Sequence, residues 1–225
     1  MRYFGDAVIL CGGKSERMDM DKSFVKIGGR YMIDIICGRL SECFDNIRLC
    51  ADSKERLNGF GLEVIEDIVV SRANGRAHGG AEGNAVDQNK IATKDRGNDR
   101  IGPAVGIYTA LTHATSKYVF MTACDMPLVD PSHIEFMKRA LEYHAYLPDA
   151  LVPMNGRYIE PLYSFYSADM ADMMEEEIRA GNYKIHRILD KCNTLYLEDH
   201  YSRIFDEELA MFTNINYAAD LDKFS

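Results

Sequence analysis

The sequence predicts an α/β fold, with a mostly parallel open sheet between two helical layers in a Rossmann-like three-layer arrangement. Two observations predict it: short continuous apolar runs of strand length recur along the chain, and stretches with helical periodicity separate them. Such alternation favours parallel strands joined by right-handed crossovers. The chain has 225 residues, of which 47% are hydrophobic, so it suits a single domain over residues 1–225.

The expected strands are apolar runs bounded by polar or glycine-rich segments. The first, Ala7–Cys11, ends at Gly12-Gly13, a pattern typical of a strand that is buried on both faces of a parallel sheet. The other runs are Ile47–Ala51, Leu62–Ile65, Tyr118–Ala123 and Ala150–Pro153.

Four helices are expected between these runs. Met32–Leu40 carries apolar residues at a spacing close to 3.6. A second helix opens at Gly102-Pro103, with proline as the first helical residue. A third starts at Asp130-Pro131, an N-cap followed by proline, and runs to Tyr143. A fourth spans about Ala168–Ala180.

Residues 71–100 differ from the rest of the chain. This stretch is rich in Gly, Asn, Ala, Arg and Asp and has almost no large apolar side chains. Because it can bury little surface, we expect a flexible insertion within the domain. A dedicated binding loop is the alternative.

Charge and composition exclude several classes of protein. The chain has 26 basic and 35 acidic residues, a net charge of −9, which argues against a nucleic-acid partner but not against a small phosphorylated ligand. No apolar run approaches the roughly 20 residues of a membrane helix, so no membrane partner is expected. The six cysteines form no C-x-x-C pair, which favours reduced thiols in a cytoplasmic protein.

A glycine-rich loop with three cations follows the first strand. In an open α/β sheet, ligands bind beyond the carboxyl ends of the strands. Gly12 and Gly13 let backbone N–H groups approach an anion, and Lys14, Arg17 and Lys22 could neutralise much of a triphosphate. The loop is neither a Walker A nor a Rossmann dinucleotide motif. A plain strand-to-loop turn is the alternative.

Polar residues at other strand ends are candidates for the same crevice. Asp125 follows the run Tyr118–Ala123, and its hard carboxylate suits Mg²⁺, although it could instead cap the turn. Asn214 and Asn216 share one face of an extended segment and could ligate Mg²⁺ or hold phosphate and ribose, or form the N-cap of a final helix. Asp67 is a further strand-end carboxylate that could accept from a base or ribose.

Two segments look like rim elements for a second substrate, namely Glu160-Pro161-Leu162-Tyr163 and Gly181-Asn182-Tyr183-Lys184. No G-x-S-x-G elbow or H-E-x-x-H motif is present, which argues against a hydrolase.

In chain order, these motifs resemble those of the molybdenum cofactor guanylyltransferase family. That family opens with a strand and a Leu-Ala-Gly-Gly-x-Ser-x-Arg-Met-Gly-x-Asp-Lys loop, which corresponds here to residues 10–22. The match continues at Glu66-Asp67, Gly102-Pro103-Ala104-Val105-Gly106, Cys124-Asp125-Met126-Pro127 and Asn214-Ile215-Asn216. The resemblance implies a fold of the nucleotide-diphospho-sugar transferase type. Gly13 and Asp21-Lys22 favour the guanylyl branch over relatives that carry Leu-Ala-Ala-Gly.

The resemblance implies transfer of GMP from GTP to a molybdopterin-type cofactor, with release of pyrophosphate and with Mg²⁺ as cofactor. Arg17, Lys22 and Asp125 take the catalytic roles, and Asp125 and Asn216 hold the metal. The nucleotide-binding residues implied are Leu10, Cys11, Gly12, Gly13, Ser15, Lys22, Asp67 and Asp125, and those for the acceptor are Asn182 and Asn214. Transient contact with molybdoenzymes or cofactor-handling proteins is also expected.

Two residues depart from the family pattern. Asp19 replaces a glycine of the loop, and Cys50 stands where some members place an asparagine near the base. Two alternatives therefore stay open. One is a guanylyl- or cytidylyltransferase that acts on another small phosphorylated acceptor, and the other is a non-catalytic nucleotide-binding adaptor.

Overall fold

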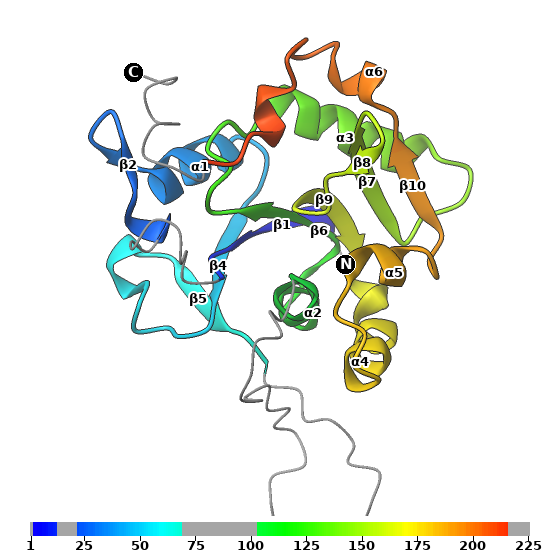
Figure 1. The fold of residues 1–225 in the computed structure, drawn as a ribbon, viewed down its shortest axis with the longest axis horizontal. Helices are drawn as coiled ribbons and strands as arrows, with labels where there is room; N and C mark the ends of the chain where they lie inside the picture. Colours follow the sequence, from blue (N-terminus) through cyan, green and yellow to red (C-terminus); the bar gives the residue numbers. More distant parts are fainter. Residues whose placement is uncertain (1, 13–21, 69–102, 216–225) are drawn as a thin grey trace, which may run out of the picture.

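The computed structural model describes residues 2–12, 22–68 and 103–215, and in this part of the chain a twisted sheet lies between two layers of helices (Figure 1). The strands of the sheet are β1 (Arg2–Leu10), β4 (Asn46–Ala51), β5 (Glu63–Glu66), β6 (Ser116–Ala123), β7 (Ala150–Asn155), β8 (Tyr158–Ile159), β9 (Tyr163–Ser167) and β10 (Thr194–Leu197). A separate small hairpin pairs β2 (Lys26–Ile27) with β3 (Arg30–Tyr31).

The strand order is β10-β7-β9-β6-β1-β4-β5, with β8 paired to β7 beside this path. β1 is parallel to both β4 and β6, β4 is parallel to β5, and β7 is parallel to β10. β9 runs antiparallel to β6 and β7. The predicted mostly parallel α/β sheet is confirmed, and the reversed β9 is a feature that the sequence analysis did not predict.

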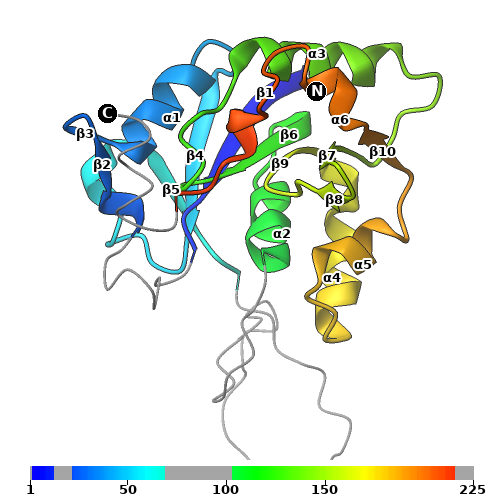
Figure 2. The same ribbon diagram turned by 45° about the horizontal axis from the view of Figure 1, so that its top comes forward.

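Helices cover both faces of the sheet. They are α1 (Met32–Leu40), α2 (Ala104–Thr112), α3 (Pro131–Tyr143), α4 (Ala171–Arg179), α5 (Ile185–Leu189) and α6 (Asp199–Ser202), with 3₁₀ turns η1 (Lys22–Phe24), η2 (Asn58–Phe60), η3 (Ala168–Met170) and η4 (Ala210–Phe212). Figure 2 shows α1 and α3 on one side of the sheet and α2, α4 and α5 on the other. None of the helices in the described part of the chain is long and apolar enough to span a bilayer.

The predicted helices agree closely with the observed ones. α1 has the predicted bounds, and α3 starts after Asp130, whose carboxylate accepts from Ser132 N–H and His133 N–H at 2.7 and 3.1 Å. α2 begins at Ala104, one residue later than predicted, because Pro103 is the N-cap. The fourth predicted helix is divided into η3 and α4. The predicted insertion at residues 71–100 lies outside the described residues.

Strand β1 forms the centre of both cores. Its side chains alternate: Ala7 and Ile9 pack in the cluster that includes α1 and α3, while Val8 and Leu10 pack in the cluster that includes α2 and α4. Because β1, β4, β5 and β6 are parallel, their carboxyl ends meet at one edge, where Leu10 pairs with both Cys50 and Ala123. Residues that follow these strands are therefore brought together at this edge.

Candidate nucleotide site

A lysine and an aspartate from distant parts of the chain form an ion pair at the carboxyl edge of the sheet. Lys22, the first residue of η1, places its Nζ 2.7 Å from Oδ2 of Asp125, which follows β6. Each side chain is 17% exposed, so water screens their interaction less than it would at an open surface. The sequence analysis predicted both residues for one pocket, and the structure brings them into direct contact.

Backbone hydrogen bonds on both sides fix the turn that carries Asp125. Cys124 N–H donates to Leu10 C=O at 3.1 Å, which ties the turn to β1. Ile215 N–H donates to Asp125 C=O at 2.8 Å. Ile215 is buried against Val25 and Met32, and the neighbouring Asn214 is exposed. Asn216 lies outside the described residues.

The end of β1 lies beside this turn. Cys11 N–H donates to Cys50 C=O at 2.8 Å, so amides that serve a ligand would start at Gly12, which is exposed and has open space where a side chain would begin. Gly13, Ser15 and Arg17, which the sequence analysis also placed here, lie outside the described residues. Leu10 and Cys11 themselves are buried.

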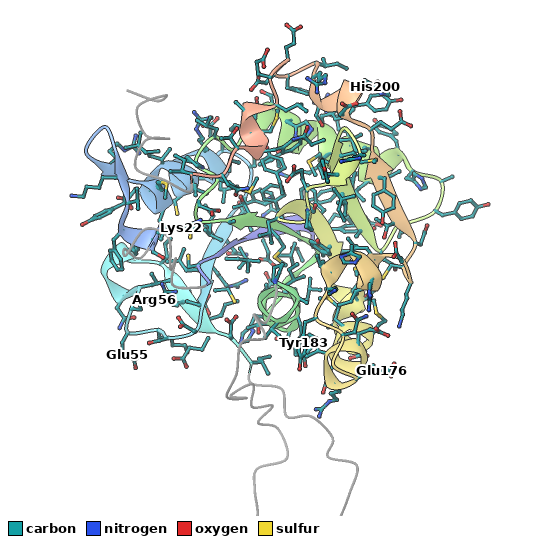
Figure 3. All side chains as sticks on the ribbon, in the orientation of Figure 1. Lys22, Glu55, Arg56, Glu176, Tyr183 and His200 are labelled. Atoms are coloured by element: carbon teal, nitrogen blue, oxygen red, sulfur yellow. The ribbon has the colours of Figure 1, made fainter. Side chains whose placement is uncertain are left out.

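An arginine that the sequence analysis missed also reaches this edge. Arg56 Nη2 donates to Cys11 C=O, and Arg56 Nε lies 3.2 Å from Asp52 Oδ1. Figure 3 shows Lys22 and Arg56 on the same side of the molecule. The ion pair with Asp52 holds this arginine next to the end of β4, and no motif in the sequence signals it.

Asp67 follows β5 and packs under the amino end of α2. Its N–H donates to Ala51 C=O at 2.8 Å, and its Oδ1 accepts from Cys50 Sγ at 3.1 Å. Burial raises the pKa of Asp67 above the usual value for aspartate, and the hydrogen bond from Cys50 offsets part of that rise. A half-buried carboxylate of this kind is a strong acceptor for a ligand that offers N–H groups.

Gly106 explains how α2 comes so close to this carboxylate. A Cβ at position 106 would lie 3.3 Å from Leu10 Cδ2 and 3.6 Å from Asp67 Oδ1. The first distance is tighter than ordinary van der Waals contact, so the glycine lets the helix approach the strand ends. The matching glycine of the sequence motif therefore has a packing role.

Asn182, predicted for acceptor binding, is held by a different contact. It lies between α4 and α5, and its Nδ2 donates to Glu177 Oε2 at 2.7 Å. This hydrogen bond joins Asn182 to its own helical layer rather than to the pair of Lys22 and Asp125. Its role stays a prediction.

The cysteines agree with the sequence analysis, because all six are free thiols. Three of them, Cys11, Cys50 and Cys124, are buried at the carboxyl edge. Cys11 and Cys124 are hydrogen-bonded to each other, and this contact together with burial raises the pKa of Cys11 well above the usual value for a thiol. Cys11 is therefore uncharged at neutral pH.

Comparisons with known proteins identify the family. Residues 7–83 and 68–195 match the model of the MobA-like NTP transferase domain. A molybdenum cofactor guanylyltransferase of Syntrophotalea carbinolica is 30% identical over 98% of this chain and 90% of its own length. A probable molybdenum cofactor guanylyltransferase of Natranaerobius thermophilus is 32% identical over 96% and 93%.

Solved structures agree with this result. Molybdopterin-guanine dinucleotide biosynthesis protein A from Archaeoglobus fulgidus superposes with a TM-score of 0.72 at 26% identity, over 97% of this chain and 95% of that one. A CMP:2-keto-3-deoxy-manno-octonic acid synthetase shares the fold alone, with a TM-score of 0.60 at 12% identity. The predicted nucleotide-diphospho-sugar transferase type of fold is thus confirmed. The chain belongs to the MobA-like NTP transferase family and, within it, to the molybdenum cofactor guanylyltransferases.

Proposed function

We propose that this protein transfers GMP from GTP to the terminal phosphate of a molybdopterin-type cofactor and releases pyrophosphate. The observation that carries the proposal is the 2.7 Å contact between Lys22 and Asp125 at the edge where the end of β1 and Asp67 also lie. This edge suits a nucleoside triphosphate. Lys22 would contact its phosphates, Asp125 would bind the metal, and Asp67 would recognise the base. The names of the full-length relatives support guanine as the base and the molybdenum cofactor as the acceptor.

The chemistry is an in-line displacement at the α-phosphorus of GTP. An oxygen of the acceptor phosphate forms a bond to this phosphorus, and the bond from phosphorus to the α,β-bridging oxygen breaks, with its electron pair leaving on pyrophosphate. The acceptor phosphate is already an anion at neutral pH, so no general base is required. Negative charge grows on the departing pyrophosphate, and Lys22, together with Arg17 of the loop, stabilises it.

The residues at this edge fit a magnesium ion. Mg²⁺ usually takes one or two protein carboxylates and completes its shell with water and substrate phosphates. Asp125 supplies such a carboxylate, and in the described part of the chain no group of three His, Cys, Asp or Glu side chains forms an all-protein metal cage. Asp125, with Asn216, would hold the ion, which supplies neutralising charge to the phosphate oxygens when bound.

Asp67 would select the base. Guanine offers N–H groups at N1 and N2 to a carboxylate, whereas adenine presents an acceptor at N1. A purine without the matching N–H would leave Oδ2 of this half-buried carboxylate without a donor from the base, which is a costly mismatch. Asp67 is held for this role by the end of β4 and by α2.

Two asparagines would contact the acceptor. Asn214 is exposed next to the turn of Asp125, which suits contact with a second substrate, and Asn182 is proposed for the opposite rim. Transient contact with molybdoenzymes or cofactor-handling proteins would follow from delivery of the product. The six free thiols support a cytoplasmic location.

The test mixes purified protein and Mg²⁺ with a molybdopterin-type cofactor as the acceptor. GTP, CTP, UTP and ATP are added in separate reactions, and pyrophosphate release is measured in each. We expect release with GTP that depends on both Mg²⁺ and acceptor. Turnover of CTP in place of GTP would support a cytidylyltransferase. Binding of GTP without turnover, with acceptor present, would support the non-catalytic adaptor.

A further inference from the structure

A thiol that the transfer reaction does not use lies against the carboxylate proposed to select the base. Cys50, near the end of β4, is 2% exposed. Its Sγ lies 3.1 Å from Asp67 Oδ1 and 3.7 Å from Gly106 C=O. A thiol has a single hydrogen to donate, and the carboxylate is both nearer and charged, so the hydrogen bond goes to Asp67.

The backbone around Asp67 is already held on both sides. Asp67 N–H donates to Ala51 C=O, and Ile68 N–H donates to Thr109 Oγ1, both at 2.8 Å. The remaining freedom of this residue is rotation of its side chain. Gly106 leaves a narrow space above the carboxyl group, and the thiol of Cys50 supplies a directional contact that selects one orientation.

We propose that Cys50 is a positioning residue for guanine recognition: its thiol occupies Oδ1 of Asp67 and thereby presents Oδ2 to the N–H edge of the base. The inference rests on the proposed function, because it assigns a role to a neighbour of the carboxylate that selects guanine. It assigns a role to the cysteine that stands where some family members have an asparagine.

The same contact favours the ionised form of the carboxylate. Burial raises the pKa of Asp67, the hydrogen bond from Cys50 lowers it, Asp52 raises it and Arg56 lowers it. Without the thiol, the pKa of Asp67 would rise further. A protonated carboxyl would present an O–H where guanine requires an acceptor, so binding would be lost at a higher pH than in the unmodified protein.

The kinetic test compares Cys50→Ala with Cys50→Ser and Cys192→Ala. Cys192 is a matched control, because it packs against the same hydrophobic cluster as Cys50 and its Sγ donates to Ile188 C=O at 3.2 Å. We expect Cys50→Ala to raise KM for GTP by about tenfold, as for loss of a hydrogen bond to a charged group. We expect kcat to change by less than about twofold, because the change acts on binding rather than on the transferred phosphoryl group.

Two further signs distinguish positioning from general damage to the core. The acid limb of kcat/KM for GTP should move to higher pH in Cys50→Ala. Cys50→Ser should recover part of the affinity, since its hydroxyl also donates. Equal KM values and equal pH profiles for Cys50→Ala and Cys192→Ala would overturn the proposal.

A titration that does not involve GTP separates this inference from the proposed function. The ¹³C shift of the Asp67 carboxyl, assigned with Asp67→Asn, reports its pKa directly. We expect a higher pKa in Cys50→Ala than in the unmodified protein, and an unchanged pKa would overturn the thiol contact. Failure of the unmodified protein to bind or use GTP would instead count against the proposed function and leave this titration valid.

Discussion

Lys22 Nζ lies 2.7 Å from Asp125 Oδ2, although 103 residues separate the two in the sequence. The contact joins the end of the glycine-rich loop to the turn after β6. The chain has a net charge of −9. Lys22 nevertheless places a cation at the edge where a triphosphate is expected to bind.

Removal of the cation should slow the transfer. We expect Lys22→Ala to lower kcat/KM for GTP by a factor of about 10²–10³, the usual effect of losing a group that stabilises transition-state charge. Lys26→Ala is the control, because Lys26 is an exposed lysine whose Nζ lies 4.4 Å from the centre of the Tyr31 ring. The rate of pyrophosphate release gives kcat/KM for both variants. Equal rates for the two would exclude the role assigned to Lys22.

Removal of the carboxylate charge should change the response to magnesium. Asp125→Asn keeps the shape of the side chain but weakens an oxygen ligand, so we expect the Mg²⁺ concentration for half-maximal activity to rise and the maximal rate to fall about 10²-fold or more. The measurement is a Mg²⁺ titration of pyrophosphate release. A titration curve that coincides with that of the unmodified protein would show that Asp125 does not hold the ion.

Two glycines in helices should respond differently to alanine. Gly106→Ala places a Cβ 3.3 Å from Leu10 Cδ2, so we expect weaker GTP binding as Leu10 and Asp67 shift. Gly38→Ala in α1 meets only Arg30 Nη2 at 3.8 Å, and we expect it to stabilise the fold by about 0.5–1 kcal/mol through helix propensity. Nucleotide titration and urea denaturation of both variants test the contrast. Weaker GTP binding in Gly38→Ala alone would contradict it.

Stability should fall in mild acid because of a buried histidine. Burial lowers the pKa of His133 from 6.5 to about 4, and its Nε2 lies 3.0 Å from Ser202 Oγ. Between these two values the unfolded chain binds the proton more readily, so the free energy of unfolding decreases as the pH falls. From pH 7 to 4.5 we expect a loss of about 2–3 kcal/mol from this residue.

The measurement is urea denaturation at several pH values in this range. His133→Gln removes the titrating group and should flatten the pH dependence, whatever its effect on stability at pH 7. An unchanged slope in the variant would show that other groups cause the acid sensitivity.

The elements predicted best are those with a strong local signal. α1 and α3 have helical periodicity, and α3 also has the Asp130-Pro131 start, so their bounds were predicted correctly. β9 was missed because its sequence mixes serine with aromatic residues. Ser164 is nevertheless buried, since its hydroxyl donates to Glu160 C=O at 2.7 Å. Such a bond becomes visible only when the tertiary structure is known.

Residues of the candidate site could be predicted where they lie shortly after the end of a strand. The rule that ligands bind at the carboxyl edge of a parallel sheet placed Lys22, Asp67 and Asp125 together. Arg56 was missed because it reaches the edge from a segment without a motif. The role of Cys50 was missed because a thiol in an apolar run is typical of a core residue, and its contact with Asp67 depends on the register of β4 with β5.

The antiparallel direction of β9 changes which segments reach the carboxyl edge of the sheet. In the antiparallel pairing Tyr163 lies opposite Thr122, near the carboxyl end of β6, so the segment entering β9 emerges beside the turn of Asp125. If β9 were parallel to β6, the segment that enters it would lie at the opposite edge of the sheet. The antiparallel direction of β9 therefore places the residues just before Tyr163 at the same edge as Asp125, where we expect them to contact a second substrate.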